Sequence, residues 1–184
     1  MAYTKSRSAS WSLHNWFSTE MIARNAMVAA LYFVLTIVSF PLSYNLANFR
    51  LSEFLNLLVF FNPAYTLGIT IGCFLANTLS PTPWDMLIGT AATLAACLLM
   101  IPFRHLFLAG LVPCIVNAVV VGFELYYLFG FGPATPLWAC MGWVMLGETV
   151  IINGLGYALF MTLSRTYKPV FKSLGATKNT EFVW

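Results

Sequence analysis

Charged side chains are scarce in this chain: Asp, Glu, Lys and Arg make up 8% of its 184 residues. Soluble domains carry roughly 25%. Hydrophobic residues account for 60% of the sequence, and the mean hydropathy is +0.80. This composition excludes an ordinary soluble domain and indicates an integral membrane protein.

The residue patterns of catalysis and metal binding are also missing. His14 and His105 each lie in flanking segments, no serine or cysteine has a plausible base partner, and no phosphate-binding Gly-Lys-Ser/Thr loop occurs. We therefore predict that the chain is not an enzyme, has no cofactor or metal site, and cannot hydrolyse ATP by itself. The cysteines lie inside apolar segments without metal-ligand spacing and are expected to be buried thiols: Cys73, Cys97, Cys114 and Cys140.

Long apolar runs predict an all-α bundle. They are the length that crosses about 30 Å of hydrocarbon as helix, and the short alternating segments of an outer-membrane barrel are missing. One apolar block, 51–80, is too long for a single span, and Asn62-Pro63 breaks it because the residue before proline disfavours helix. The expected spans are 21–42, two within 51–80, 86–103, 106–129 and 137–164, which makes six transmembrane helices.

Basic residues at both ends of the chain favour this even number. The positive-inside rule places both termini in the cytoplasm, and Arg50 is then the basic residue left outside. The end residues in question are Lys5, Arg7, Arg24, Arg165, Lys168, Lys172 and Lys178. We expect a cytoplasmic or interfacial segment over 1–20 without a cleaved signal peptide, a transmembrane domain over 21–164 and a cytoplasmic tail over 165–184.

The few charges inside the apolar region predict a ligand site. Arg50 and Glu53 lie three residues apart at the edge of a hydrophobic block, and ionisable groups inside spans usually face a cavity, a partner charge or a pathway. The predicted pocket opens outward between helices and comprises Arg50, Glu53, Asn77, Asp85, Asn117, Glu124 and Glu148. Its candidate aromatic walls are Tyr44, Phe49, Trp84, Tyr126, Tyr127 and Trp138.

Each of these residues also has a purely structural interpretation. Arg50 and Glu53 form a possible local i,i+3 ion pair, and Asp85 suits the N-terminus of a helix through the helix dipole. Aromatics at span ends commonly form an interfacial belt. Glu148 is the hardest to explain structurally, because it lies well inside an apolar span with no cation nearby in sequence.

Several short motifs together resemble one family. They are residues 49–53 (FRLSE), 72–77 (GCFLAN), 80–85 (SPTPWD), 89–93 (GTAAT), 117–124 and the Gly147-Glu148 pair. Over about 26–163 the chain resembles the QueT-type family of substrate-binding S components of energy-coupling-factor (ECF) ABC transporters. The resemblance implies a six-helix S-component fold with both termini cytoplasmic, in a multi-pass plasma-membrane protein of a prokaryote.

The resemblance also implies partners and a substrate class. S components work with a transmembrane coupling subunit and two ATPases, which use the ATP, and they dock through an Ala-x-x-x-Ala pattern that Ala26 and Ala30 match. The implied cargo is a micronutrient, either a queuosine precursor or cobalamin; no nucleic acid is expected. The alternatives are a stand-alone proton-coupled transporter of a small polar metabolite, with Glu124 or Glu148 as relay, and a structural membrane protein that binds no ligand.

Overall fold

The structure, a computed structural model, describes residues 16–44, 46, 48–166, 169 and 174–176, and these contain helices and no strand. The all-α prediction is confirmed for this part of the chain. In order, the elements are α2 (Thr19–Val38), α3 (Phe40–Ser43), η1 (Leu51–Asn56), α4 (Leu57–Phe61), α5 (Tyr65–Asn77), η2 (Pro83–Met86), α6 (Ile88–Met100), α7 (Leu106–Tyr127), α8 (Leu137–Glu148), η3 (Thr149–Gly156) and α9 (Tyr157–Thr166).

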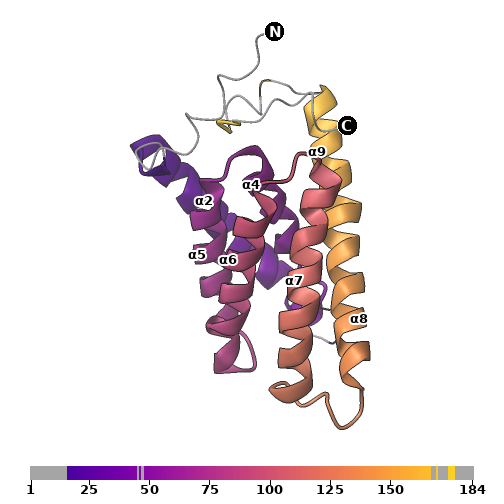
Figure 1. Ribbon diagram of the computed structural model, residues 1–184. Coiled ribbons are helices and arrows are strands. Elements are labelled where there is room, and N and C mark those ends of the chain that lie inside the picture. Colours follow the sequence, from indigo (N-terminus) through magenta and orange to yellow (C-terminus); the bar gives the residue numbers. More distant parts are fainter. Residues whose placement is uncertain (1–15, 45, 47, 167–168, 170–173, 177–184) are drawn as a thin grey trace.

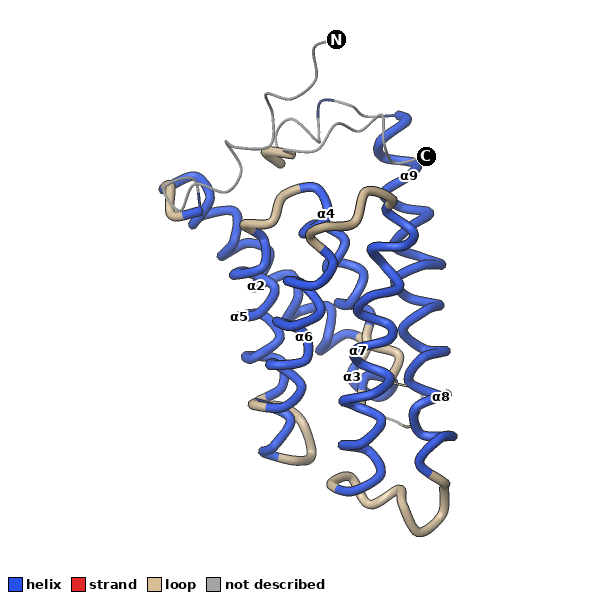
Figure 2. The backbone as a smooth tube through the Cα atoms, in the orientation of Figure 1, coloured by secondary structure: helices blue, strands red, loops and turns tan. Residues whose placement is uncertain are grey.

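The long helices stand side by side as a bundle (Figure 1). Helix α2 packs against α5, α6 contacts both α5 and α7, and α7 contacts α8. Most of the loops lie at the two ends of the bundle (Figure 2). Helix α2 begins and α9 ends at the same end of it (Figure 1).

Four helical segments are long and apolar enough to cross a membrane, namely Thr19–Val38, Pro83–Met100, Leu106–Tyr127 and Leu137–Thr166. This is consistent with an integral membrane protein. The two segments of the split apolar block, Leu51–Phe61 and Tyr65–Asn77, are shorter. With a rise of about 2.0 Å per residue in the 3₁₀-helix η1 and about 1.5 Å in α4 and α5, each is about 20 Å long, less than the roughly 30 Å of hydrocarbon. The count of six crossings therefore stays a prediction.

The predicted break at Asn62-Pro63 is present. The Oδ1 of Asn62 accepts a hydrogen bond from the backbone N–H of Ala64 at 3.0 Å, which closes the turn between α4 and α5. The predicted first span, 21–42, extends beyond the end of the first long helix. Helix α2 already ends at Val38, and Pro41 lies in the first turn of α3, where proline is tolerated because the first helical N–H groups need no partner.

Helix α4 lies in the centre of the core. All five of its residues are buried, and a helix that is apolar on every side is stable only when it is surrounded. Helix α4 is thus shielded by its neighbours despite its short length.

The predicted burial of the four cysteines is confirmed, because each is fully buried as a free thiol.

Two glycines allow α2 and α5 to approach closely. A Cβ at Gly68 would lie 2.6 Å from the backbone oxygen of Asn25, and one at Gly72 would lie 2.9 Å from that of Ala29. The side chain of Asn25 also bonds to the α5 backbone: its Nδ2 donates to the oxygen of Ala64 at 3.1 Å, and its Oδ1 accepts from the N–H of Gly68 at 2.9 Å. Small residues four apart permit such packing between membrane helices.

The last long helical segment, residues 137–166, is not one regular α-helix. The segment Thr149–Gly156 is a π-helix between α8 and α9. A π-helical turn inside an α-helix is rare and is often found at functional sites. It begins directly after Glu148, one of the predicted site residues.

Candidate ligand-binding site

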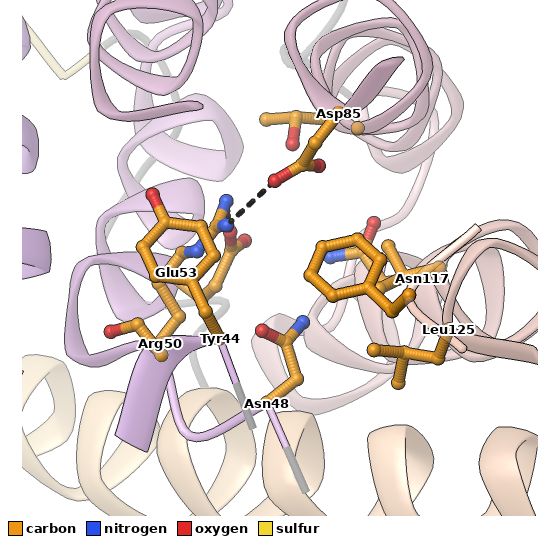
Figure 3. A pocket seen from close by; sticks show the side chains of 12 residues that line it. Tyr44, Asn48, Arg50, Glu53, Asp85, Asn117 and Leu125 are labelled. Atoms are coloured by element: carbon orange, nitrogen blue, oxygen red, sulfur yellow. Dashed lines mark ion pairs between the residues drawn. The ribbon is translucent and has the colours of Figure 1, made fainter. Parts of the chain in front are cut away.

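A polar pocket lies among the α3–η1 connection, η1, η2, α6 and α7 (Figure 3). Its volume is about 360 Å³ when the space open to solvent is counted. The residues that line it are Ser43, Tyr44, Asn48, Arg50, Glu53, Asp85, Gly89, Thr93, Asn117, Val121, Leu125 and Phe129. The structure thus brings four of the seven predicted site residues to one cavity, from four separate elements.

Arg50 is the central charge of the pocket. Its side chain is buried, and its Nη2 lies 3.6 Å from Oδ2 of Asp85 while its Nη1 lies 3.9 Å from Oε1 of Glu53 (Figure 3). The ring of Tyr44 faces the guanidinium, 5.0 Å from ring centroid to Cζ, a cation–π distance. Arg50 Nε is buried and has no hydrogen-bond partner among the described residues. The local i,i+3 pair with Glu53 exists, but the shorter ion pair of Arg50 is the one to Asp85.

Tyr44 is held in place by its hydroxyl group, which donates to the backbone oxygen of Ala76 at 2.6 Å. Burial raises the pKa of Tyr44 to about 12, although the positive charge of Arg50 acts in the opposite direction. The phenol is therefore neutral at physiological pH. Its ring is available to a flat ligand or to Arg50 as an uncharged face.

Glu53 is held by neutral donors. Its Oε1 accepts from the hydroxyl of Tyr32 at 2.5 Å, and its Oε2 accepts from Nδ2 of Asn56 at 2.6 Å. Tyr32 comes from α2, so this bond depends on the close approach of α2 to the inner helices. Hydrogen bonds to both oxygens restrain the side chain in one position. Glu53 is therefore a fixed part of the pocket wall.

Asp85 is positioned by α5 and α6. The Nδ2 of Asn77, at the last residue of α5, donates to the backbone oxygen of Asp85 at 3.0 Å. Gly89 provides the space for the Asp85 carboxylate, since a Cβ there would lie 2.1 Å from Oδ1. Asn77 itself does not line the pocket. Its place in the structure is that of a support behind Asp85.

Asn117 and Glu148 connect the pocket to the last helices. Asn117 lines the pocket from α7, and its Nδ2 donates to Oε1 of Glu148 at 3.1 Å. Glu148 lies behind Asn117 and is fully buried at the start of the π-helix. Because the amide N–H of Asn117 is used by Glu148, its Oδ1, which has no partner among the described residues, remains as an acceptor.

Glu124 is buried on α7 but does not line the cavity. It lies seven residues after Asn117, on the same helical face as predicted, and close enough to Asp85 and Arg50 to interact electrostatically with both. Neither of its carboxylate oxygens has a hydrogen-bond partner among the described residues.

Most of the predicted aromatic walls are elsewhere. Tyr44 lines the pocket, but Trp84, Tyr127 and Trp138 are exposed by 57%, 66% and 76%. That exposure is typical of aromatics at the ends of membrane helices, which face the lipid headgroups. Phe49 and Tyr126 are partly buried and do not line the pocket either. Of the six candidate aromatic walls, Tyr44 lines this pocket, and the exposure of Trp84, Tyr127 and Trp138 agrees with the alternative interpretation as an interfacial belt.

Sequence reasoning missed several lining residues that carry no charge. Asn48 has a left-handed backbone conformation, with φ of 44°, and directs the chain into η1. Val121 and Leu125 follow Asn117 at four-residue intervals and thus share its helical face. Gly89 and Thr93 show the same spacing on α6. The four-residue spacing from a polar residue is the sequence signal that could have identified these lining residues.

The arrangement of these groups is suited to binding a ligand. No group of three His, Cys, Asp or Glu side chains that could hold a metal ion occurs in the part of the chain that the structure describes. The pocket combines three acceptors, from Glu53, Asp85 and Asn117, with one cationic donor. Such a pocket suits a small ligand with several N–H groups.

The position of Gly89 leads to a testable prediction. Gly89→Ala is expected to fold, because the obstructing atom is the end of the Asp85 side chain, but to displace that carboxylate from Arg50. We expect ligand affinity to fall about tenfold, which corresponds to about 1.4 kcal/mol. The measurement is a ligand titration alongside thermal unfolding in detergent.

The matched control is Gly142→Ala in α8, where a Cβ would meet nothing within 4 Å. It should leave affinity unchanged and thermal stability equal or slightly higher, because alanine is the better helix former. If Gly89→Ala binds ligand as the unsubstituted protein does, the placement of Asp85 in the site is wrong.

Comparison with known proteins adds the family. The profile of the QueT transporter family matches residues 22–165. The queuosine precursor transporter QueT of Lactococcus lactis subsp. cremoris (strain MG1363) is 45% identical over 78 residues, which cover 41% of this chain and 46% of that protein. The match thus spans less than half of this relative's length. No solved structure matches the chain. Because the family profile covers most of the sequence, the chain belongs to the QueT transporter family.

Proposed function

We propose that this chain is the substrate-binding S component of an ECF transporter that imports a queuosine precursor. The observation that carries the proposal is the buried cluster of Arg50, Asp85 and Glu53 at one pocket of a largely apolar bundle. Membership of the QueT transporter family supports transport. The name of the Lactococcus relative supports the cargo.

The chemistry of the pocket suits the flat deazaguanine base of such precursors. An amino group beside a ring N–H forms paired hydrogen bonds with a carboxylate, which Asp85 or Glu53 offers. A ring carbonyl would accept from Arg50, and Tyr44 offers a neutral aromatic face.

The proposed topology has six crossings with both termini in the cytoplasm, in the plasma membrane of a prokaryotic cell. Helix α2 begins and α9 ends at the same end of the bundle, which supports an even number of crossings (Figure 1). The pocket lies toward the opposite end, because it is lined from residues that follow α2, from the start of α6 and from the last turns of α7. On this topology the ligand enters from outside.

The proposed partners are a transmembrane coupling subunit and two ATPases, with ATP hydrolysed by the ATPases alone. Ala26 and Ala30 support this, because both are exposed on α2, on the face opposite the one that packs against α5. The same face exposes Met27, Leu31 and Val34. Small residues beside larger apolar ones let a partner helix approach closely in the membrane. Rotation of the loaded S component against the coupling subunit would then release the ligand inside.

The first test is a titration of the full chain in detergent with a deazaguanine precursor and, separately, with cobalamin. We expect saturable one-to-one binding of the precursor and no binding of cobalamin. Binding of cobalamin alone would contradict the proposed cargo. Precursor uptake driven by a proton gradient, without any ATPase, would instead identify a stand-alone secondary transporter.

A second test separates binding from partner docking. Ala30→Leu should leave precursor binding by the isolated chain unchanged and reduce ATP-dependent uptake at least about tenfold, because the larger side chain holds the helices apart. Uptake into cells that carry the coupling subunit and ATPases is the measurement. The matched control is Ala91→Leu, at an exposed position of α6. The docking assignment fails if Ala30→Leu loses binding but still assembles with the coupling subunit.

A further inference from the structure

The region of the pocket holds more negative than positive groups. Four of the six acidic residues of the chain, Glu53, Asp85, Glu124 and Glu148, lie at the pocket or beside it. Within the described residues, the ion pairs that reach this group both come from Arg50. A buried carboxylate without a partner is costly. These carboxylates therefore favour a ligand that brings positive charge or N–H donors.

Three of the four carboxylates already have partners. Glu53 accepts from Tyr32 and Asn56, one oxygen each. Asp85 is paired with Arg50. Glu148 accepts from Asn117 with one oxygen.

Glu124 differs from the other three. Its residue is 2% exposed, and neither Oε1 nor Oε2 has a hydrogen-bond partner in the part of the chain that is described. A neutral carboxyl group would need an acceptor for its proton at this depth, just as an ionised one needs donors. The described residues supply neither.

The position of Glu124 connects it with the ligand. It immediately precedes Leu125, a lining residue, and shares a helical face with Asn117, another lining residue. Its electrostatic interaction with Asp85 and Arg50 places it near the charged wall. A group that projects from a ligand bound between Arg50 and Asn117 would thus find an unpaired carboxylate at this side of the pocket.

We propose that Glu124 binds a protonated amine of the ligand and so selects the amine-bearing form of a deazaguanine precursor over forms whose side group is neutral. This inference rests on the proposed function, because it assigns a specificity residue to the same site. An ammonium group supplies three donors and a positive charge, which matches an unpaired carboxylate. A nitrile group in its place has no donor and leaves Glu124 without a partner.

The experiment is a titration of the full chain with two probes that share one ring, 7-aminomethyl-7-deazaguanine and 7-cyano-7-deazaguanine. We expect the unsubstituted protein to bind the amine at least about tenfold more tightly than the nitrile. Glu124→Gln, which keeps the shape and removes the charge, should weaken amine binding about 10- to 100-fold, the range for a lost charge-assisted hydrogen bond. Nitrile affinity should change little, which also shows that the variant is folded.

The matched control is Glu20→Gln. Glu20 is exposed in the first turn of α2 and pairs with Arg24. No residue of α2 is among those that line the pocket. Glu20→Gln should not alter the preference between the two probes. Equal affinity of the unsubstituted protein for amine and nitrile would overturn the role of Glu124, and so would an equal loss of both in Glu124→Gln. Failure of both probes to bind the unsubstituted protein would instead overturn the proposed cargo.

Discussion

The buried guanidinium of Arg50 is the interaction on which the rest of the site depends. A charge inside an apolar bundle is stable only with partners close by. Here Asp85, Glu53 and the ring of Tyr44 supply them, from η2, η1 and the residue after α3. The same contacts hold these elements around one cavity. The pairs are 3.6 and 3.9 Å long, and the Nε of Arg50 has no hydrogen-bond partner among the described residues, so the cluster retains capacity for a ligand.

The close helix packing on one side of the bundle supports this cluster. Gly68 and Gly72 let α2 approach α5, and this brings the hydroxyl of Tyr32 to Glu53. On α6, Gly89 leaves the space for the carboxylate of Asp85, which lies in η2. The charged groups of the site can thus take their positions because glycines stand beside them. The opposite face of α2, which carries Ala26 and Ala30, remains exposed for a partner.

The part of the site that the sequence could predict is the part made of rare residues. Arg50, Glu53, Asp85 and Asn117 are conspicuous in apolar surroundings, where polar groups are costly and thus have a reason to be present. Ser43, Thr93 and Val121 are ordinary residues of membrane helices, so only the three-dimensional arrangement marks them as lining residues. Trp84 and Trp138 could not be assigned from sequence for a related reason: an aromatic side chain at the end of a span suits the headgroup region as well as the wall of a ligand site.

The fold class followed from composition, and the main helix boundaries followed from proline and turn signals. The details that did not follow depend on tertiary packing. The short central helix α4 is stable because its neighbours surround it. The local sequence pattern does not predict those neighbours. The same holds for the π-helix after Glu148, since its residues are compatible with an ordinary α-helix, and for the bonds between Asn25 and α5.

The position of a bound ligand shows whether the Arg50 cluster is the ligand site. The measurement is an experimental structure of the chain with a deazaguanine precursor. We expect the ring between the α3–η1 connection and α7, with polar atoms within hydrogen-bond distance of Arg50 and of Asp85 or Glu53. A precursor bound outside this cavity, with the Arg50 cluster unchanged and without contact to it, would show that the ligand site lies elsewhere.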